Sequence, residues 1–306
     1  MFRKIKINNG VDNMTMSAQA LKDKSRNIAK QNRISVQEVL QNYMFERILE
    51  RLSVSRYKDN FILKGGLLLS SIVGIDIRTT MDMDTTITGI ALDKLELKKI
   101  LTEILNIELN DNIKFEITGV QSIKEEDYYG GYNYKIIAIF ENIKVILNID
   151  ISTGDVITPG AIEYSYKTLF DNRTFGLLTY NYETIIAEKF QTVMQRANMN
   201  SRMKDYYDIY YFVNKKWESI NKELLVDAII KTFLNRNSIQ LLKTINETLE
   251  DIKNNKLLDT LWENYKNKHS FARDIKYEAT VNSLCLIKNL LFDEKYKDLI
   301  IKYNIA

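Results

Sequence analysis

Hydrophobic residues recur at helical spacing near the start of the chain. Ser35 and Glu38 form a capping-box pattern, with a hydroxyl at the helix start and a carboxylate three residues later. Apolar or aromatic residues then follow at positions 36, 39, 40, 43, 44 and 48, which is the period of one helix face. The pattern therefore predicts that helices open the chain.

The period changes between about residues 76 and 170, where strand-like segments dominate. Alternation and Thr-rich composition predict strands at 82–87, from 115 onward, at 134–140 and at 143–151, with a helix at 91–109. The last two strands are separated only by Glu141 and Asn142, so we expect them to form a hairpin. This part of the chain predicts a β-sheet.

Helical spacing returns beyond about residue 180 and continues to the last residue of the sequence. The predicted helices lie near 182–198, 201–214, 221–235, 237–253, 256–268, 271–291 and 294–303. We therefore expect an α+β fold in two domains. The first is an α/β domain with N-terminal helices at 1–175, and the second is an all-α domain at 176–306.

Composition narrows the chemistry that this chain can perform. Among 306 residues there is one histidine, His269, and one cysteine, Cys285, which argues against Ser-His-Asp, Cys-His and multi-histidine zinc sites. The net charge of +3 neither demands nor excludes a nucleic-acid partner. No apolar run is long enough to span a membrane, and Met1 to Lys6 lack a following apolar stretch, so we expect a cytoplasmic protein.

Two acidic residues follow a glycine pair. Asp82 and Asp84 are one residue apart in a predicted strand, so their side chains project from the same face. Repulsion between them favours a hard divalent cation such as Mg²⁺ or Mn²⁺. Gly65 and Gly66 precede a helix-like run, whose first amides suit a phosphate. Each pattern alone is common at surfaces and in turns, but their combination favours a site.

Further candidates lie beyond this pair. Asp150 interrupts an apolar strand, and it is either a half-exposed strand residue or part of a site. Lys189 shares a helix face with Ile185 and Val193. It either extends its ammonium to solvent or directs it into a cleft toward Asp82, Asp84 or a bound phosphate.

A charged helix and a loop carry weaker signals. Arg202 with Asp205, and Lys204 with Asp208, have the spacing of surface ion pairs along one helix. Asp155 follows a glycine and is predicted to be a turn residue.

Taken in order, these blocks resemble the AbiEii/AbiGii family of nucleotidyltransferase toxins. The matching segments are LKGG at 63–66, RTTMDMD at 78–84, IDIS at 149–152, IAEK at 186–189 and RMKDYYDI at 202–209. The resemblance implies a DNA polymerase β-like minimal nucleotidyltransferase domain. It also implies a type IV toxin of an abortive-infection system directed against phage, whose antitoxin acts without a stable complex.

The same resemblance implies roles for individual residues. Asp82, Asp84 and Asp150 would bind Mg²⁺ or Mn²⁺, and together with Lys189 they would be catalytic. The NTP, either GTP or a pyrimidine NTP, would lie against the cofactor-binding residues Gly65, Gly66, Lys189, Arg202, Lys204 and Asp205. The helical domain would thus contribute Lys189 and Arg202 to the cleft.

The expected reaction transfers NMP from an NTP to an acceptor, and relatives of this family suggest the 3′ end of an RNA such as tRNA. We expect no DNA and no membrane partner. Two alternatives stay open at this point: an NTP-sensing or RNA-binding toxin that acts by sequestration, and nucleotide transfer to a protein. The paired carboxylates argue against a pure binding protein, because binding alone does not need them.

Overall fold

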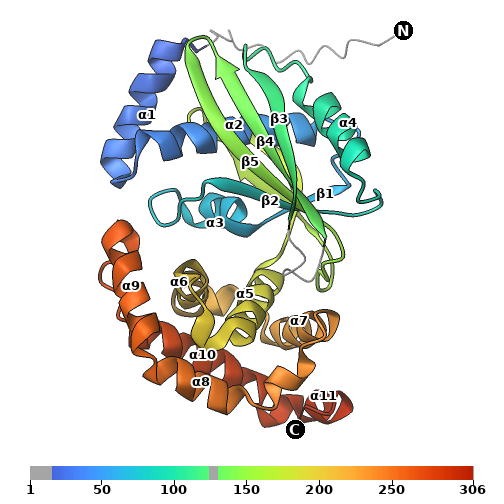
Figure 1. The fold of residues 1–306 in the computed structure, drawn as a ribbon, viewed down its shortest axis with the longest axis vertical. Helices are drawn as coiled ribbons and strands as arrows, with labels where there is room; N and C mark the ends of the chain where they lie inside the picture. The colour runs from blue at the N-terminus through green and yellow to red at the C-terminus, as the bar shows by residue number, and fades with distance from the viewer. Residues whose placement is uncertain (1–15, 124–129, 306) are drawn as a thin grey trace.

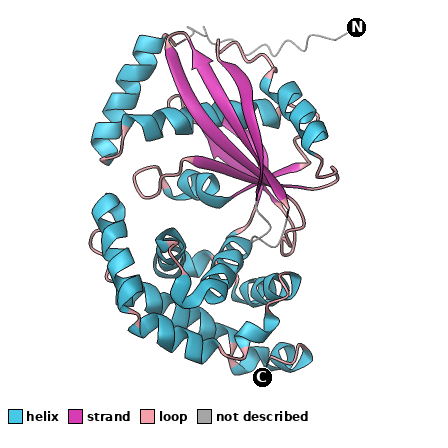
Figure 2. Ribbon diagram, in the orientation of Figure 1, coloured by secondary structure: helices cyan, strands magenta, loops and turns pink. Residues whose placement is uncertain are grey.

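The computed structural model describes residues 16–123 and 130–305, so Met1 to Lys6 lie outside the described residues. The strands gather in one half of the molecule, and helices α5 to α11 form the other half (Figures 1 and 2). The strands are β1 (Phe61–Lys64), β2 (Asp82–Ile87), β3 (Lys114–Ile123), β4 (Gly131–Phe140), β5 (Ile143–Ser152), β6 (Ile162–Lys167) and β7 (Thr174–Thr179). The expected α+β fold is confirmed.

These strands form one mixed sheet of seven strands in the order β3-β4-β5-β2-β1-β7-β6. β2 runs parallel to β5, and β1 runs parallel to β7, whereas the other neighbours are antiparallel. β4 and β5 form the predicted hairpin, in which Glu141 adopts the left-handed conformation with φ 49°. Alternation in β5 buries Val145, Leu147 and Ile149 on one face.

Four helices accompany the sheet. They are α1 (Ala18–Asn32), α2 (Val36–Ser53), α3 (Gly65–Val73) and α4 (Lys94–Leu105). The predicted capping box starts α2: the Ser35 hydroxyl accepts from the Glu38 amide, and the Glu38 carboxylate accepts from the Ser35 amide. Glu38 also accepts a hydrogen bond from the Thr79 hydroxyl, which ties the loop before β2 to the start of α2.

The helical half follows the predicted pattern with shorter elements. Its α-helices are α5 (Tyr182–Arg196), α6 (Met203–Tyr211), α7 (Lys222–Asn235), α8 (Ile245–Asn254), α9 (Lys256–Lys268), α10 (Tyr277–Leu291) and α11 (Lys297–Lys302). α8 and α10 begin later than predicted, because 3₁₀ turns at Ile239–Leu242 and Ser270–Ala272 take up the difference. A π-helical turn, Phe212–Lys216, extends α6. Within residues 16–123 and 130–305, no helix is both long and apolar enough to cross a bilayer.

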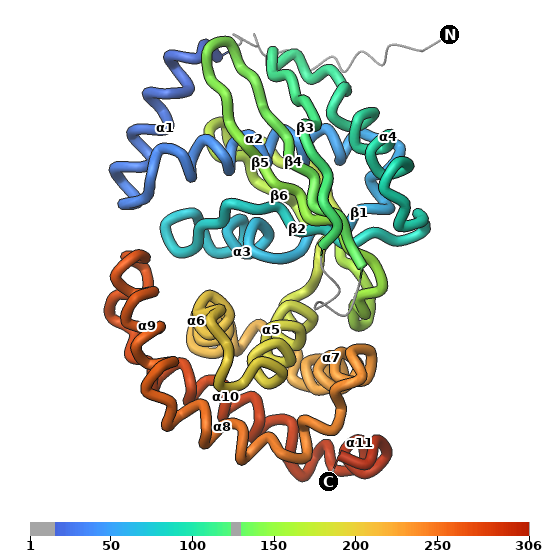
Figure 3. The backbone as a smooth tube through the Cα atoms, viewed as in Figure 1, coloured from blue at the N-terminus to red at the C-terminus, as the bar shows by residue number. Residues whose placement is uncertain are grey.

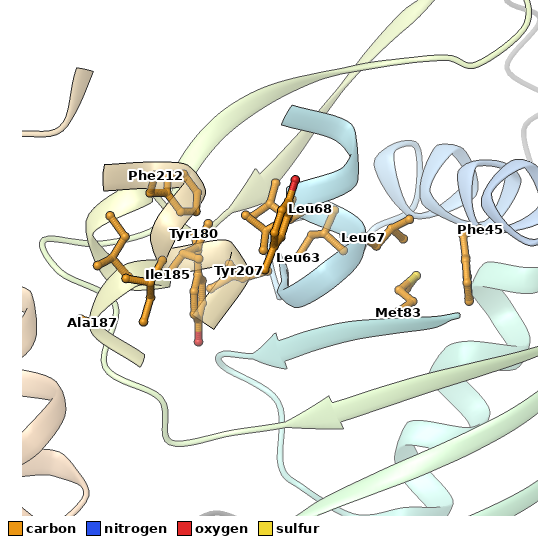
Figure 4. Packing of buried hydrophobic residues seen from close by; sticks show 14 of the residues in the cluster. Phe45, Leu63, Leu67, Leu68, Met83, Tyr180, Ile185, Ala187, Tyr207 and Phe212 are labelled. Carbon is orange, nitrogen blue, oxygen red and sulfur yellow. The ribbon is translucent and has the colours of Figure 1, made fainter. Parts of the chain in front are cut away.

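One continuous hydrophobic core joins the two halves. Figure 4 shows buried side chains that extend from Phe45 and Met83 past Leu67 to Ile185 and Phe212. The expected domain boundary between residues 175 and 176 falls inside β7, and the division into two domains stays a prediction. The shared core holds the walls of the cleft between the halves in fixed positions.

Candidate active site

A cleft of about 320 Å³ lies between the sheet and the helical half. Its sheet side is formed by the end of β1, the start of α3, the first half of β2 and the end of β5. Its helical side is formed by α5, α6 and the end of α7. The cleft is lined by every predicted site residue: Gly65, Gly66, Asp82, Asp84, Asp150, Lys189, Arg202, Lys204 and Asp205.

Strand register brings the three predicted carboxylates together. β2 and β5 are parallel neighbours in which Asp84 stands opposite Asp150 and Asp82 opposite Asn148. Burial raises the pKa of Asp82, and the charge of Asp84 raises it further, against the opposing effect of Lys204. Burial likewise raises the pKa of Asp150, although a hydrogen bond from Asn133 opposes that rise. These carboxylates repel one another at neutral pH.

This carboxylate set has the donor chemistry of a divalent-cation site. Carboxylate oxygens are the preferred ligands of Mg²⁺ and Mn²⁺, and the mutual repulsion of Asp82, Asp84 and Asp150 is what such a cation would relieve. Within the described part of the chain, no three carboxylate, imidazole or thiol groups are already gathered closely enough to hold a metal ion. A metal at this position would therefore require the side chains to draw together.

The glycine pair is required by close packing against the acids. A Cβ on Gly65 would lie 2.0 Å from Asp84 Oδ2, and Gly65 also has a positive φ of 66°. A Cβ on Gly66 would lie 2.7 Å from Thr80 Oγ1. The Gly66 amide donates a long hydrogen bond of 3.4 Å to Asp84 Oδ2, so the start of α3 and the acidic pair form one unit.

The helical wall of the cleft is a row of alternating charges. Arg202 Nε lies 2.7 Å from Asp205, and Lys189 Nζ lies 2.8 Å from Asp205. The same lysine nitrogen lies 2.7 Å from Asp208, whose other oxygen is 2.9 Å from Arg78 Nε. We call these five residues the charge row. It links α5 and α6 to the loop that precedes β2.

The charge row corrects two expectations. Lys189 lines the cleft with its side chain 12% exposed, but its ammonium binds Asp205 and Asp208 and is not directed at Asp82 or Asp84; that it meets a bound phosphate stays a prediction. The expected pairing of Lys204 with Asp208 is also wrong, because Asp208 is bound by Lys189 and by Arg78, 130 residues earlier in the sequence. Helical spacing alone gave no sign of these partners.

Lys204 instead faces the carboxylates. Its charge lowers the pKa of both Asp82 and Asp150, against the larger effect of burial in each case. Its side chain is exposed at the start of α6 and lines the cleft. Lys204 is therefore the cation that the structure places over the acidic side of the site.

A second ion cluster at the cleft floor was missed by the sequence reasoning. Asp155 is not an exposed turn residue: its side chain is 2% exposed and lies 2.6 Å from Lys64 Nζ. Glu188 stands nearby, 3.3 Å from Arg236 Nη2, and Tyr180 donates to it. The only available signal was the motif lysine before Gly65, since the partners lie far apart in the sequence.

The Asp155→Asn substitution is expected to cost on the order of 2 kcal/mol of stability at neutral pH. Burial alone would raise the pKa of Asp155, but Lys64 outweighs it and lowers the pKa to about 2. An unfolded Asp titrates near 3.9, so the ionised carboxylate contributes stability above about pH 4 that is lost as the pH falls toward 2. Urea unfolding at several pH values should show the difference between wild type and variant shrinking across this window.

The surface pair of Glu223 with Lys295, 3.9 Å apart and exposed, supplies the control. Glu223→Gln should change the free energy of unfolding by less than about 1 kcal/mol at any of these pH values. An Asp155→Asn protein as stable as wild type at pH 7 would contradict the role of the Lys64 pair.

A protein-family model matches most of the chain. The model of a family described as Nucleotidyl transferase AbiEii toxin, Type IV TA system, matches residues 47–283. That match covers more than half of the chain and includes every residue of the cleft named above. No curated protein sequence matches the chain.

Solved structures show more distant likenesses. JHP933 from Helicobacter pylori is 15% identical with a TM-score of 0.48, and the alignment covers 88% of this chain and 97% of that one. An antigenic nucleotidyltransferase-like protein from Paracoccidioides brasiliensis is 14% identical with a TM-score of 0.32, covering 77% of this chain and 94% of that one. The family match, rather than these likenesses, carries the assignment.

Proposed function

The chain belongs to the AbiEii family of nucleotidyl transferase toxins, and on that premise we propose that it transfers NMP from an NTP to the 3′ hydroxyl of an RNA. The observation that carries this proposal is the cleft itself. Three carboxylates on two adjacent strands face a wall that holds Lys204 and the charge row. Cations on one wall and carboxylates on the other suit a triphosphate and a reacting hydroxyl that are bound between them.

The acidic side would hold the metal. Mg²⁺ or Mn²⁺ bound by Asp82, Asp84 and Asp150 would neutralise the triphosphate and favour attack on its α-phosphorus. The remaining contributions come from the chain itself. The Gly66 amide at the start of α3, together with Lys204 and Arg202, would attract the phosphates and oppose the charge that develops on the leaving group.

Asp150 would accept the proton of the attacking hydroxyl. In the proposed step the acceptor oxygen bonds to the α-phosphorus, the bond from that phosphorus to pyrophosphate breaks, and Asp150 takes the hydroxyl proton. Its pKa is raised by burial, and Asn133 fixes one carboxylate oxygen by a hydrogen bond of 2.5 Å. A raised pKa makes a carboxylate a better base near neutral pH.

The main role of the charge row would be to hold Arg202 in position for the phosphates. Lys189 and Asp205 hold Arg202 at the cleft wall, so the phosphate-facing role assigned to Lys189 would be shared with Arg202 and Lys204. The substrate would be GTP or a pyrimidine NTP. We further propose that the toxin acts in the cytoplasm during phage infection and that its antitoxin counters it without a stable complex.

The direct test incubates purified protein with each α-labelled NTP, Mg²⁺ or Mn²⁺, and either total RNA or total protein from cells. We expect label at RNA 3′ ends from GTP or a pyrimidine NTP, and its loss when EDTA removes the metal. Label on protein and not on RNA would overturn the proposal that the acceptor is an RNA. Tight RNA or NTP binding without any transfer would overturn catalysis and favour a toxin that acts by sequestration.

A further inference from the structure

Within residues 16–123 and 130–305, no helix covers one face of the long strands beside the candidate active site. In Figure 1, α2 passes behind β5, β4 and β3, and no helix is drawn in front of them. Figure 3 shows the same three strands side by side. α2 contacts the sheet through Gln41, whose amide donates to the Ile146 carbonyl, and the buried residues of β4 and β5 face the helices. The opposite face carries the half-buried and exposed side chains.

Strand register arranges the polar side chains of this face in two rungs that cross the strands. The first rung runs from Asp84 through Asp150 and Asn133 to Gln121 at the edge strand. The second rung runs from Asp82 through Asn148 and Lys135 to Gly119. Each rung therefore begins at a candidate metal ligand and ends at β3, the edge of the sheet.

Hydrogen bonds make the rungs continuous with the site. Asn133 donates to Asp150 at 2.5 Å, and Asn148 donates to Asp82 at 3.5 Å. A second hollow of about 300 Å³ is lined by Asn133 and Asn148 together with Gly119, Gln121, Lys135 and Ile146. Gly119 has no side chain to fill this hollow. Asn133 and Asn148 of this hollow thus hydrogen-bond to Asp150 and Asp82, which line the main cleft.

The chemistry of this face suits single-stranded RNA. Side-chain amides such as Gln121 both donate and accept hydrogen bonds, as base edges require. Ile146, 49% exposed, offers an apolar surface for a base. Charge is complementary to phosphate as well: Lys135 is exposed on the second rung, and Lys114 and Lys144 are exposed farther along the same face, with Glu116 as their acidic neighbour.

We propose that the open face of β3, β4 and β5 seats the last nucleotides of the RNA acceptor, which cross the strands along the two rungs. This inference rests on the proposed function, because it places the 3′ hydroxyl at Asp150. The triphosphate then occupies the opposite side, where Lys204, Arg202 and the start of α3 stand. The two substrates approach the carboxylates from opposite directions, and the sheet face selects the acceptor sequence.

The test separates RNA binding from NTP binding. Lys135→Glu and Gln121→Ala alter exposed residues of the rungs that touch neither Asp82 nor Asp150, whereas Lys99→Glu places the same charge change on exposed α4. Affinity for a short, 5′-fluorescent single-stranded RNA is measured by anisotropy over a range of salt concentrations. Affinity for a fluorescent GTP analogue, and KM for both substrates, are measured with the same proteins.

We expect Lys135→Glu to weaken RNA affinity roughly tenfold and to reduce the slope of log affinity against log salt by about one. KM for RNA should rise in parallel while KM for the NTP stays unchanged. Gln121→Ala should change the preferred 3′ sequence, and Lys99→Glu should match wild type. Melting temperatures confirm that each variant is folded, and Gln121→Ala at the edge strand tests the face if Lys135→Glu does not fold.

Failure of this inference differs from failure of the proposed function. A wild type that transfers nucleotides to RNA, with Lys135→Glu binding RNA as tightly as Lys99→Glu does, would overturn the sheet face alone. If Lys135→Glu lost NTP affinity and RNA affinity equally, the inference would be overturned too, because the sheet face would then not be an RNA-binding site separate from the NTP site. A wild type that labels only protein would overturn both the RNA occupant and the proposed acceptor.

Discussion

The Asp84→Asn variant is expected to lose nucleotidyl transfer by at least about 100-fold while keeping or gaining stability. Asp84 raises the pKa of both Asp82 and Asp150, so its charge disfavours their ionised forms. An amide at this position still accepts the Gly66 hydrogen bond but removes one of three repelling charges. At pH 7 the free energy of unfolding should therefore be equal to or higher than that of wild type.

The role of the metal is measured in the same proteins. MgCl₂ or MnCl₂ should raise the melting temperature of the wild type, because a ligand that binds only the folded state stabilises it, and should raise that of the variant much less. Asp251→Asn, on the exposed side of α8, is the matched control and should behave as wild type. A folded Asp84→Asn protein with normal transfer and growth arrest would eliminate the carboxylate site.

The second large effect concerns the charge row. Lys189→Met should lower the free energy of unfolding by roughly 3–5 kcal/mol, because it leaves Asp205 and Asp208 buried with one cation fewer each. Methionine matches the length of the lysine stem, so loss of packing contributes little. Transfer activity should fall as well, since Arg202 is held at the cleft wall through Asp205.

Acid should narrow this difference in stability. Burial alone would raise the pKa of Asp205, but Lys189 and then Arg202 lower it below its usual range. The stabilising contribution of that carboxylate is therefore present above an unfolded pKa near 3.9 and is lost as the pH falls below it. Urea unfolding should show the gap between wild type and Lys189→Met at its widest near pH 7 and smaller below pH 4.

An exposed lysine provides the comparison for this result. Lys253 stands 4.0 Å from Glu250 with both side chains exposed, and Lys253→Met should change stability by less than about 1 kcal/mol. If Lys189→Met left stability equally unchanged, the ammonium would contribute nothing to the cleft wall, and Asp205 and Asp208 would not depend on it.

Local patterns were sufficient for much of the sheet and for part of the site. β2 has the predicted bounds, and the β4–β5 hairpin turns at Glu141 as its spacing predicted. The shared face of Asp82 and Asp84 also follows from alternation, a property of the chain over a few residues. β1, β6 and β7 were not predicted, because β1 is four residues long and all three depend on partners elsewhere in the sheet.

The remaining site features depend on tertiary contacts. Arg78 meets Asp208 across 130 residues, and Lys64 meets Asp155 across 91. Helical spacing favoured Lys204 as the ion-pair partner of Asp208. Because Asp208 is buried, it pairs instead with the distant Arg78. The partner of each buried charged residue in the cleft is therefore set by the folded structure and not by its neighbours in the sequence.

The charge row also determines when, during synthesis of the chain, the helical wall of the cleft can form. The ribosome delivers the three carboxylates first, and Lys189, Arg202 and Asp208 emerge only later. Asp208 must then fold back onto Arg78 to join the helical wall to the sheet. On the proposed function, a nascent chain is therefore expected to stay inactive until α6 has left the exit tunnel, when most of the molecule has been synthesised.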